Sequence, residues 1–289
     1  MSTTTEELRS GTTPKTTPHA SAADEVGGGR FRRAVVSQLQ PRNLLIWFLR
    51  IGVFVGFILL WNVAVDQGWV DEFFVSRPSA VWDTLVAYFE TGDVWRHGSV
   101  TVRSTIYGFV TGSVAGVLVG MLFARFPLLD KVFSPYLAAL NAMPRVALAP
   151  LFILWFGIGS SSKVWFAFSL VFFIVLINTE AGIKGVDQEL TTAARVMGAN
   201  EWQRFTKVIF PAAVPTIFAG LRLGFVYALL GVVFGEMLAS REGLGQQITF
   251  YAGTYRMHGV LATLVILSAI SIFLNGIIVR IQTWLLRWQ

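Results

Sequence analysis

The stretch GFVTGSVAGVLVG, residues 108–120, places four glycines at intervals of four residues inside an apolar run. Residues four apart lie on one face of an α-helix, so Gly108, Gly112, Gly116 and Gly120 predict a helix with one face that lacks side chains. Such a face lets a neighbouring helix backbone approach closely within a membrane. The spacing therefore predicts a tight packing seam, either within this chain or between two copies, and leaves open which helix fills it.

The composition places the rest of the chain in a bilayer as well. Of its 289 residues 54% are hydrophobic and 14% are charged, and the mean hydropathy is +0.60. Apolar stretches are centred near residues 55, 112, 144, 173, 225 and 270. Each has about 20 residues, the length that a helix needs to cross a hydrocarbon core of about 30 Å. Strand-period alternation is absent from the sequence, so we predict an all-α, polytopic membrane protein with six transmembrane helices.

The charges of the connecting segments predict the domain order and the orientation. Residues 1–43 are polar and end in several arginines, which predicts a disordered, basic cytoplasmic tail. Residues 44–65 form the first transmembrane helix, and residues 66–99, with six acidic residues against two arginines, an extracytoplasmic loop. Residues 100–289 form a five-helix core with a basic cytoplasmic loop at 185–211. Six spans then leave both termini in the cytoplasm.

The third span is predicted to be interrupted. It holds Pro135, Pro144 and Pro150, and each proline removes an amide donor and obstructs the preceding turn. Irregular backbone survives at membrane depth only where protein buries it or water lines it, so this span is expected to face a translocation cavity. The candidate residues of the translocation path are Pro144 and Arg145 in this span and Arg222 in the fifth, and the two arginines are the ones whose charge would suit an anionic solute. The alternative for both is a structural role, with Arg145 paired to a carbonyl or a carboxylate.

The central loop predicts an amphipathic helical hairpin. Apolar residues recur at helical spacing over residues 190–197, and Gly198 follows, the residue type that most readily ends a helix in a left-handed conformation. Asn200 and Gln203 have the spacing of a capping box, which begins a second helix. That helix is expected to stop at Pro211. The pattern alone is compatible with docking of a partner or with a plain surface lid.

The same loop resembles the EAA loop of permease subunits of binding-protein-dependent ABC importers, whose pattern is Glu-Ala-Ala, three residues, Gly, nine residues, Ile, one residue, Leu-Pro. The residues that carry the resemblance are Ala193, Ala194, Gly198, Val208, Phe210 and Pro211. Thr192 stands where the family usually has Glu, and Glu189, one turn earlier, is the candidate substitute for that charge. The resemblance assigns a coupling role toward an ATPase to Glu189, Thr192, Ala193, Ala194, Gly198, Trp202, Phe205 and Pro211.

The resemblance extends over roughly residues 75–285. The segments PRVALAPL (144–151), LWFGIG (154–159) and GLG (243–245) are similar to the subfamily that carries nitrate, sulfonates and taurine. It implies a type I importer permease in a bacterial inner membrane. The partners it implies are a second permease chain, most simply in a homodimer, two copies of an ATPase subunit that binds ATP and Mg, and an extracytoplasmic solute-binding protein.

Several kinds of chemistry are absent from the sequence. The chain has no cysteine, and His19, His97 and His258 lie too far apart in sequence for a metal-ligand spacing. The string GIGSSSKV, residues 157–164, lacks the glycine before Lys163 and the hydroxyl residue after it that a phosphate-binding loop requires. We therefore expect no enzymatic activity, no metal, no cofactor and no nucleic-acid partner in this chain, with ATP hydrolysis in a partner subunit.

Two other classes of protein fit the sequence less well. A secondary transporter driven by an ion gradient would be expected to show inverted repeats and carboxylates at mid-membrane depth, and the sequence displays neither convincingly. A membrane enzyme would need paired acids, a nucleophile or a metal cluster. The sequence does not identify the transported solute, and nitrate, taurine, alkanesulfonates, bicarbonate and thiamine-precursor pyrimidines are all candidates.

Overall fold

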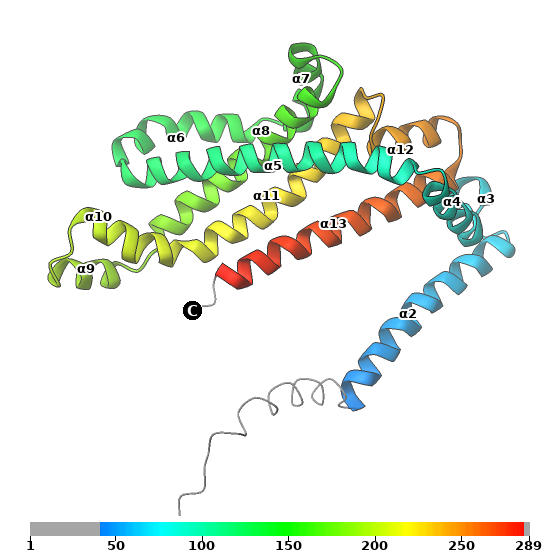
Figure 1. Ribbon diagram of the computed structural model, residues 1–289, viewed down its shortest axis with the longest axis horizontal. Helices are drawn as coiled ribbons and strands as arrows, with labels where there is room; N and C mark the ends of the chain where they lie inside the picture. The colour runs from blue at the N-terminus through cyan, green and yellow to red at the C-terminus, as the bar shows by residue number, and fades with distance from the viewer. Residues whose placement is uncertain (1–40, 286–289) are drawn as a thin grey trace, which may run out of the picture. The chain divides into compact units, whose positions relative to one another are not determined.

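A computed structural model describes residues 41–285, with side chains from residue 45 onward, and all its regular elements are helices (Figure 1). The chain divides into two units, residues 1–60 and 61–289, and the described part of the first is one stretch of helix. The predicted tail lies outside the described residues except for residues 41–43, which already belong to α2. The helices are α2 (Pro41–Asp66), α3 (Glu72–Val75), α4 (Pro78–Glu90), α5 (Asp93–Arg125), α6 (Pro127–Ala142), η2 (Arg145–Leu148), α7 (Ala149–Phe156), α8 (Ser160–Lys184), α9 (Gln188–Val196), α10 (Glu201–Arg204), η3 (Phe205–Ile209), α11 (Phe210–Leu238), α12 (Leu244–Gly253) and α13 (Met257–Leu285).

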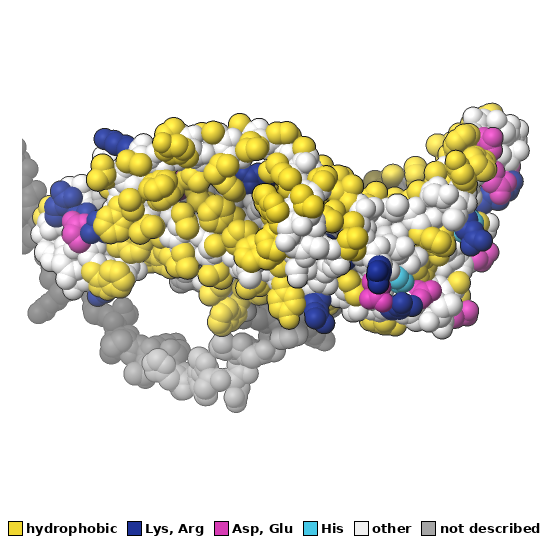
Figure 2. Space-filling view, turned by 90° about the horizontal axis from the view of Figure 1, so that it is seen from above, with side chains coloured by type: hydrophobic (Ala, Val, Ile, Leu, Met, Phe, Trp, Pro, Cys, Tyr) yellow, Lys and Arg dark blue, Asp and Glu magenta, His cyan; other side chains and the backbone are white. Residues whose placement is uncertain are grey.

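The prediction of an all-α membrane protein is confirmed. Five stretches of the described chain are helical, long and apolar enough to cross a bilayer, namely Leu45–Asp66, Asp93–Arg125, Ser160–Lys184, Glu201–Leu238 and Met257–Leu285. The pair α6 and η2–α7 is bent by 82° and makes a sixth span if it is counted as one. Figure 2 shows hydrophobic side chains over most of the face in view, with the acidic side chains gathered toward its ends and a few Lys or Arg side chains in between. That distribution suits a protein surrounded by hydrocarbon along its middle.

The four glycines of α5 lie against α8. A Cβ atom placed on Gly108 would lie 2.6 Å from the Cβ of Ala167, and one on Gly112 would lie 2.8 Å from the Cβ of Val171. The same register continues at Gly116 and Gly120. Since the paired residue numbers rise together on both helices, α5 and α8 run parallel. The close approach of the two backbones depends on glycine at each of these levels.

Helix α11 packs on α8 with a second set of small residues. A Cβ atom on Gly220 would lie 2.4 Å from the Cβ of Asn178, and one on Gly231 would lie 2.6 Å from a methyl group of Leu170. Here the residue numbers run in opposite directions, so α11 is antiparallel to α8. Val171 and Val175, both fully buried, fill the centre of this packing. Helix α8 is therefore the central element of the second unit.

The segment from 66 to 99, predicted as a loop, is largely helical. Pro78 occupies the first turn of α4, where its missing amide donor costs nothing. Helix α4 is amphipathic, and its Val81 and Tyr88 are buried in one cluster with Leu244 of α12 and Ile266 of α13. Helix α5 begins at Asp93, earlier than the predicted second span. Burial of the apolar face of α4 orders this segment, an interaction with residues far away in the chain that local sequence does not reveal.

The predicted interruption of the third span is confirmed. Pro144 lies between α6 and η2, where the chain bends. Pro135 lies inside α6, and Pro150 lies in the first turn of α7. The effect of each proline therefore depends on its place within a helix, and the bend falls where Pro144 precludes a continuous ladder of hydrogen bonds.

Replacing Gly116 by alanine should destabilise the α5–α8 packing. The added methyl would lie 2.7 Å from the Phe172 carbonyl oxygen and 2.9 Å from the Val175 Cβ, contacts that neither helix can relieve without moving. We expect the free energy of unfolding in detergent to fall by about 1–3 kcal/mol. Gly276→Ala is the matched control, because a Cβ atom there meets nothing within 4 Å. Equal stability of the two variants would contradict the seam.

Candidate coupling hairpin and translocation path

The hairpin of α9 and α10 is built by three local signals. The Asp187 side chain accepts a hydrogen bond from the Glu189 amide at 2.8 Å and so begins α9. Gly198 ends it with φ +82°, and the amide of Ala199 donates to the Ala194 carbonyl at 3.0 Å. Asn200 then forms a capping box with the third residue of α10. The predicted glycine termination and capping box are both confirmed.

The tip of this hairpin exposes large apolar side chains. Val196 is 83% exposed, Met197 86% and Trp202 72%. Phe205, in contrast, packs partly buried against the cluster of Ile183, Ala213 and Ile217. We call Val196, Met197 and Trp202 the hairpin tip. The remaining residues assigned to coupling lie on or next to the same hairpin: Glu189, Thr192 and Ala193 are exposed, and Ala194 and Pro211 are partly exposed.

The expected stop at Pro211 is wrong. The chain stays helical from Glu201 through Leu238, and a π-helical turn, η3, lies immediately before Pro211. In this turn the Phe210 amide donates to the Phe205 carbonyl, five residues earlier. The wider turn places Pro211 in the first turn of α11, where a proline needs no amide partner. The hairpin is therefore joined to the span α11 without a break.

A groove separates the hairpin from the end of α5. It has a volume of about 640 Å³, and its lining includes Leu118 and Phe126 on one side and Trp202 and Phe210 on the other. Arg125 and Glu201 supply charges to the lining. The hairpin thus rests beside α5 with an apolar space between them.

Arg145 is bound to α8 by a hydrogen bond and a cation–π contact. Its guanidinium donates to the Ser169 carbonyl oxygen and, at 3.0 Å, to the Asn141 side chain. It also lies over the ring of Phe173, 3.8 Å from the centroid. A pairing with a carbonyl, the structural alternative weighed for this residue, is thus present, and the residue stays partly exposed beside the bend at Pro144.

Arg222 lies on α11, between the levels of Gly220 and Gly224. It is exposed and makes no hydrogen bond or ion pair with the residues that the structure describes. Those glycines face Asn178 and Val175 of α8, whereas Arg145 contacts Ser169 and Phe173. The two candidate path arginines therefore lie at neighbouring levels of α8 without contacting each other.

The structure contains a buried polar cluster that was not predicted from the sequence. Glu236 near the end of α11 is 1% exposed, and its carboxylate accepts hydrogen bonds from the Thr101 hydroxyl and the Gly245 amide, each at 2.9 Å. The ammonium group of Lys163, 3% exposed, lies 3.8 Å from this carboxylate. His97 is buried next to it and accepts from the Gly243 amide at 3.1 Å. The cluster joins α5, α8 and the turn between α11 and α12.

One signal could have found this cluster. Lys163 and Glu236 are opposite charges, each within one turn of an end of a mostly apolar span. Buried charges are usually paired, so two of opposite sign at the same depth predict each other. The glycines at 243 and 245 are the second half of the signal, since a Cβ atom on Gly243 would lie 2.2 Å from the Glu236 carboxylate.

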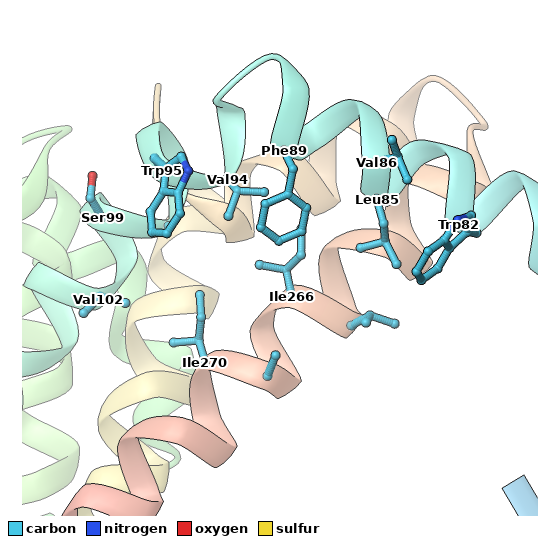
Figure 3. Close-up of a pocket in the computed structure, with 13 residues that line it drawn as sticks. Trp82, Leu85, Val86, Phe89, Val94, Trp95, Ser99, Val102, Ile266 and Ile270 are labelled. Carbon is cyan, nitrogen blue, oxygen red and sulfur yellow. The ribbon is translucent and has the colours of Figure 1, made fainter.

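A separate cavity lies between α4, the start of α5 and α13. Figure 3 shows Leu85 and Phe89 of α4 directed toward Ile266 of α13, with Val94 of α5 beside them. Its volume is about 570 Å³, and no charged residue lines it. A small polar solute would lose its hydration there without compensation, so this cavity is not a candidate solute site.

The family and the relatives that this chain matches are components of transport systems. A family model described as binding-protein-dependent transport system inner membrane component matches residues 112–288. The riboflavin transport system permease protein RibX of Chloroflexus aurantiacus is 33% identical over 232 residues, covering 80% of this chain and 87% of that protein. SsuC of Bacillus subtilis, a permease protein named for aliphatic sulfonates transport, is 31% identical and covers 80% of this chain and 84% of its own.

A third relative and a solved structure extend the comparison. The formylaminopyrimidine transport permease protein ThiX of Halalkalibacterium halodurans is 31% identical and covers 67% of this chain and 77% of its own. A structure of the MetNI methionine ABC transporter in an inward-facing conformation matches with a TM-score of 0.52 at 24% identity. That match covers 68% of this chain and 97% of the solved chain, and it shows the fold.

Replacing Glu236 by glutamine should destabilise the protein far more than the same change at Glu242. Loss of the buried carboxylate leaves Lys163 buried without a counter-charge, which we expect to cost about 3–5 kcal/mol of unfolding free energy. Glu242 pairs with Arg96 at 3.0 Å, but both side chains are about half exposed. We expect that change to cost at most about 1 kcal/mol. Thermal unfolding in detergent compares them, and equal losses would contradict the assigned burial.

Proposed function

The chain belongs to the family of binding-protein-dependent transport system inner membrane components, which makes it a permease subunit of an ABC importer, and we propose that its pathway carries a small anionic solute. In such systems the ATPase is a separate subunit. The solute class we propose is that of nitrate, a sulfonate or taurine. The observation that supports it is Arg145, a partly exposed cation held beside the bend of the interrupted third span.

The names of the relatives differ in the solute they state. Riboflavin, aliphatic sulfonates and a formylaminopyrimidine appear among proteins of similar identity to this chain. Identity alone therefore does not select a solute. The charge of the spans is the better guide: Glu180 and Glu236 are both paired with lysines, whereas Arg145 and Arg222 have no carboxylate partner among the described residues. An anion would gain from this excess of positive charge and a cation would not.

The hairpin tip is the proposed contact with the ATPase. Large apolar side chains that stay exposed at the end of a short, well-capped hairpin suit a protein interface. Since α10, η3 and α11 are continuous, a force on the tip would act directly on a transmembrane helix. We infer that ATP-driven closure of two ATPase subunits, which bind ATP and Mg, moves the hairpins and opens the pathway to either side in turn.

The remaining partners and the orientation follow from the same proposal. Two copies of this chain form the pathway, and an extracytoplasmic binding protein delivers the solute. The hairpin faces the cytoplasm, and six spans place both termini on that side of a bacterial inner membrane.

Replacing Val196 by aspartate should uncouple transport from ATP hydrolysis. The residue is 83% exposed, so the charge does not disturb folding, but it would be buried against the ATPase. We expect ATPase stimulation by the loaded binding protein to fall at least about tenfold, measured on the reconstituted complex. Thr283→Asp adds the same charge at an exposed position in α13, outside both the hairpin and the extracytoplasmic segment 66–99, and should leave stimulation unchanged. Normal stimulation in the Val196 variant would refute the hairpin as coupler.

Removing the charge of Arg145 should impair passage of the solute. In proteoliposomes that hold the whole importer, we expect Arg145→Gln to lower ATP-driven uptake of nitrate, methanesulfonate or taurine about tenfold, because a desolvated anion loses its cation. Arg145→Lys keeps the charge and should restore most of the uptake. If Arg145→Lys lowers uptake as much as Arg145→Gln does, uptake depends on the shape of the guanidinium group and not on its charge. That result would give Arg145 a structural role alone.

A further inference from the structure

A polar cavity lies where α5 and α8 begin, separate from the hairpin and from the bend at Pro144. Its volume is about 410 Å³. Three segments far apart in the sequence form its wall: Arg96 and Val100 of α5, residues 158–160 with Lys163 around the start of α8, and residues 240–242 between α11 and α12. Unlike the apolar cavity of Figure 3, which no charged residue lines, this one is lined by four.

The charges of this cavity do not balance. Arg96 pairs with Glu242 at 3.0 Å, and Lys163 lies 3.8 Å from Glu236 behind the wall. Arg241 also lines the cavity, is exposed and makes no ion pair with any described residue. One guanidinium group, with five N–H donors, is therefore left without a counter-ion.

The start of α8 adds to the positive potential. Gly159 is its N-cap and supplies no side chain, and no acidic residue occurs in the first turn. The first amide groups of a helix have no partner within it, and they carry the positive end of the helix dipole. Gly159 and Ser160 both line the cavity, so this helix end borders it. These residues belong to the string 157–164, which lacks the motif for a nucleotide but provides a helix start.

Lys163 holds the opposite wall in place. Its side chain is 3% exposed, and its ammonium group donates to the Ser240 hydroxyl at 2.6 Å and to the Glu242 carbonyl oxygen at 3.2 Å. The residues on either side of Arg241 are thus tied to α8. A guanidinium group and a helix start are in this way kept on the wall of one cavity before any ligand arrives.

We propose that this cavity binds a small tetrahedral oxyanion, such as a sulfonate or a phosphate group, that belongs to a free solute and not to a lipid headgroup. Arg241 would donate hydrogen bonds to the anion, and the amides at the start of α8 would donate from the other side. A role as the first contact of the transported solute rests on the function proposed above. Binding itself does not depend on it.

The test measures binding to the full-length chain without its ATPase. Radiolabelled sulfate is equilibrated with the chain in phosphatidylcholine nanodiscs, which leave both faces accessible. We expect saturable binding that Arg241→Gln weakens at least about tenfold, the usual effect of losing a charge-assisted hydrogen bond. Arg256→Gln is the matched control, because Arg256 is exposed between α12 and α13 and does not line the cavity. It should change the affinity by less than about twofold.

A second variant tests the amide donors at the start of α8 without changing Arg241. Ser160→Pro removes one amide donor at the first position of α8, where proline is compatible with a helix. We expect weaker sulfate binding with an unchanged melting temperature.

Three results would overturn the proposal: no saturable binding to the unaltered chain, equal loss in the Arg241 and Arg256 variants, or loss of sulfate binding when phosphatidylglycerol is added, which would make a lipid headgroup the occupant. Retained binding together with absent ATP-driven uptake would contradict the proposed function and leave the site intact.

Discussion

The close packing of small residues on α8 is the constraint on which the second unit depends. Lipid tails are as apolar as leucine, so membrane helices gain little from hydrophobic burial against each other and associate through packing and hydrogen bonds. The glycines of α5 and of α11 bring two backbones against α8, one parallel and one antiparallel. Two features with a chemical role are positioned by this helix: Arg145 binds the Ser169 carbonyl, and Lys163 pairs with Glu236 of α11.

The buried charges at the start of α8 show how polar groups are retained at the end of a span. A lone ammonium or carboxylate would be costly there, and pairing with hydrogen bonds offsets much of that cost. The carboxylate of Glu236 is satisfied by Thr101 and by the Gly245 amide, and glycine at 243 is required by the space that the carboxylate occupies. The same cluster orders the turn that carries Arg241. A structural ion pair and an adjacent excess of positive charge therefore arise from one arrangement.

The candidate translocation path and the coupling hairpin both lie where a regular helix is interrupted. Pro144 bends the third span, Gly198 ends α9 and exposes the hairpin tip, and the π-turn of η3 joins the hairpin to α11. Each interruption frees backbone groups or side chains that a continuous helix would keep satisfied or buried. The uninterrupted parts of α5, α8 and α11 supply rigidity, so displacement of the hairpin would move a whole helix rather than deform it.

Local patterns in the sequence were sufficient for the six apolar spans, the bend at Pro144, the glycine termination and the capping box of the hairpin, because each depends on residues a few positions apart. They were also sufficient to identify a glycine-lined face, though not its partner. The partner helix α8, the helical order of residues 66–99, the continuation past Pro211 and the joining of Lys163, Glu236 and His97 were decided only by tertiary structure. These features depend on contacts between residues far apart in the sequence, such as Gly112 with Val171 and Lys163 with Glu236, or on the wider turn before Pro211. No local periodicity encodes which distant surface a given side chain will meet.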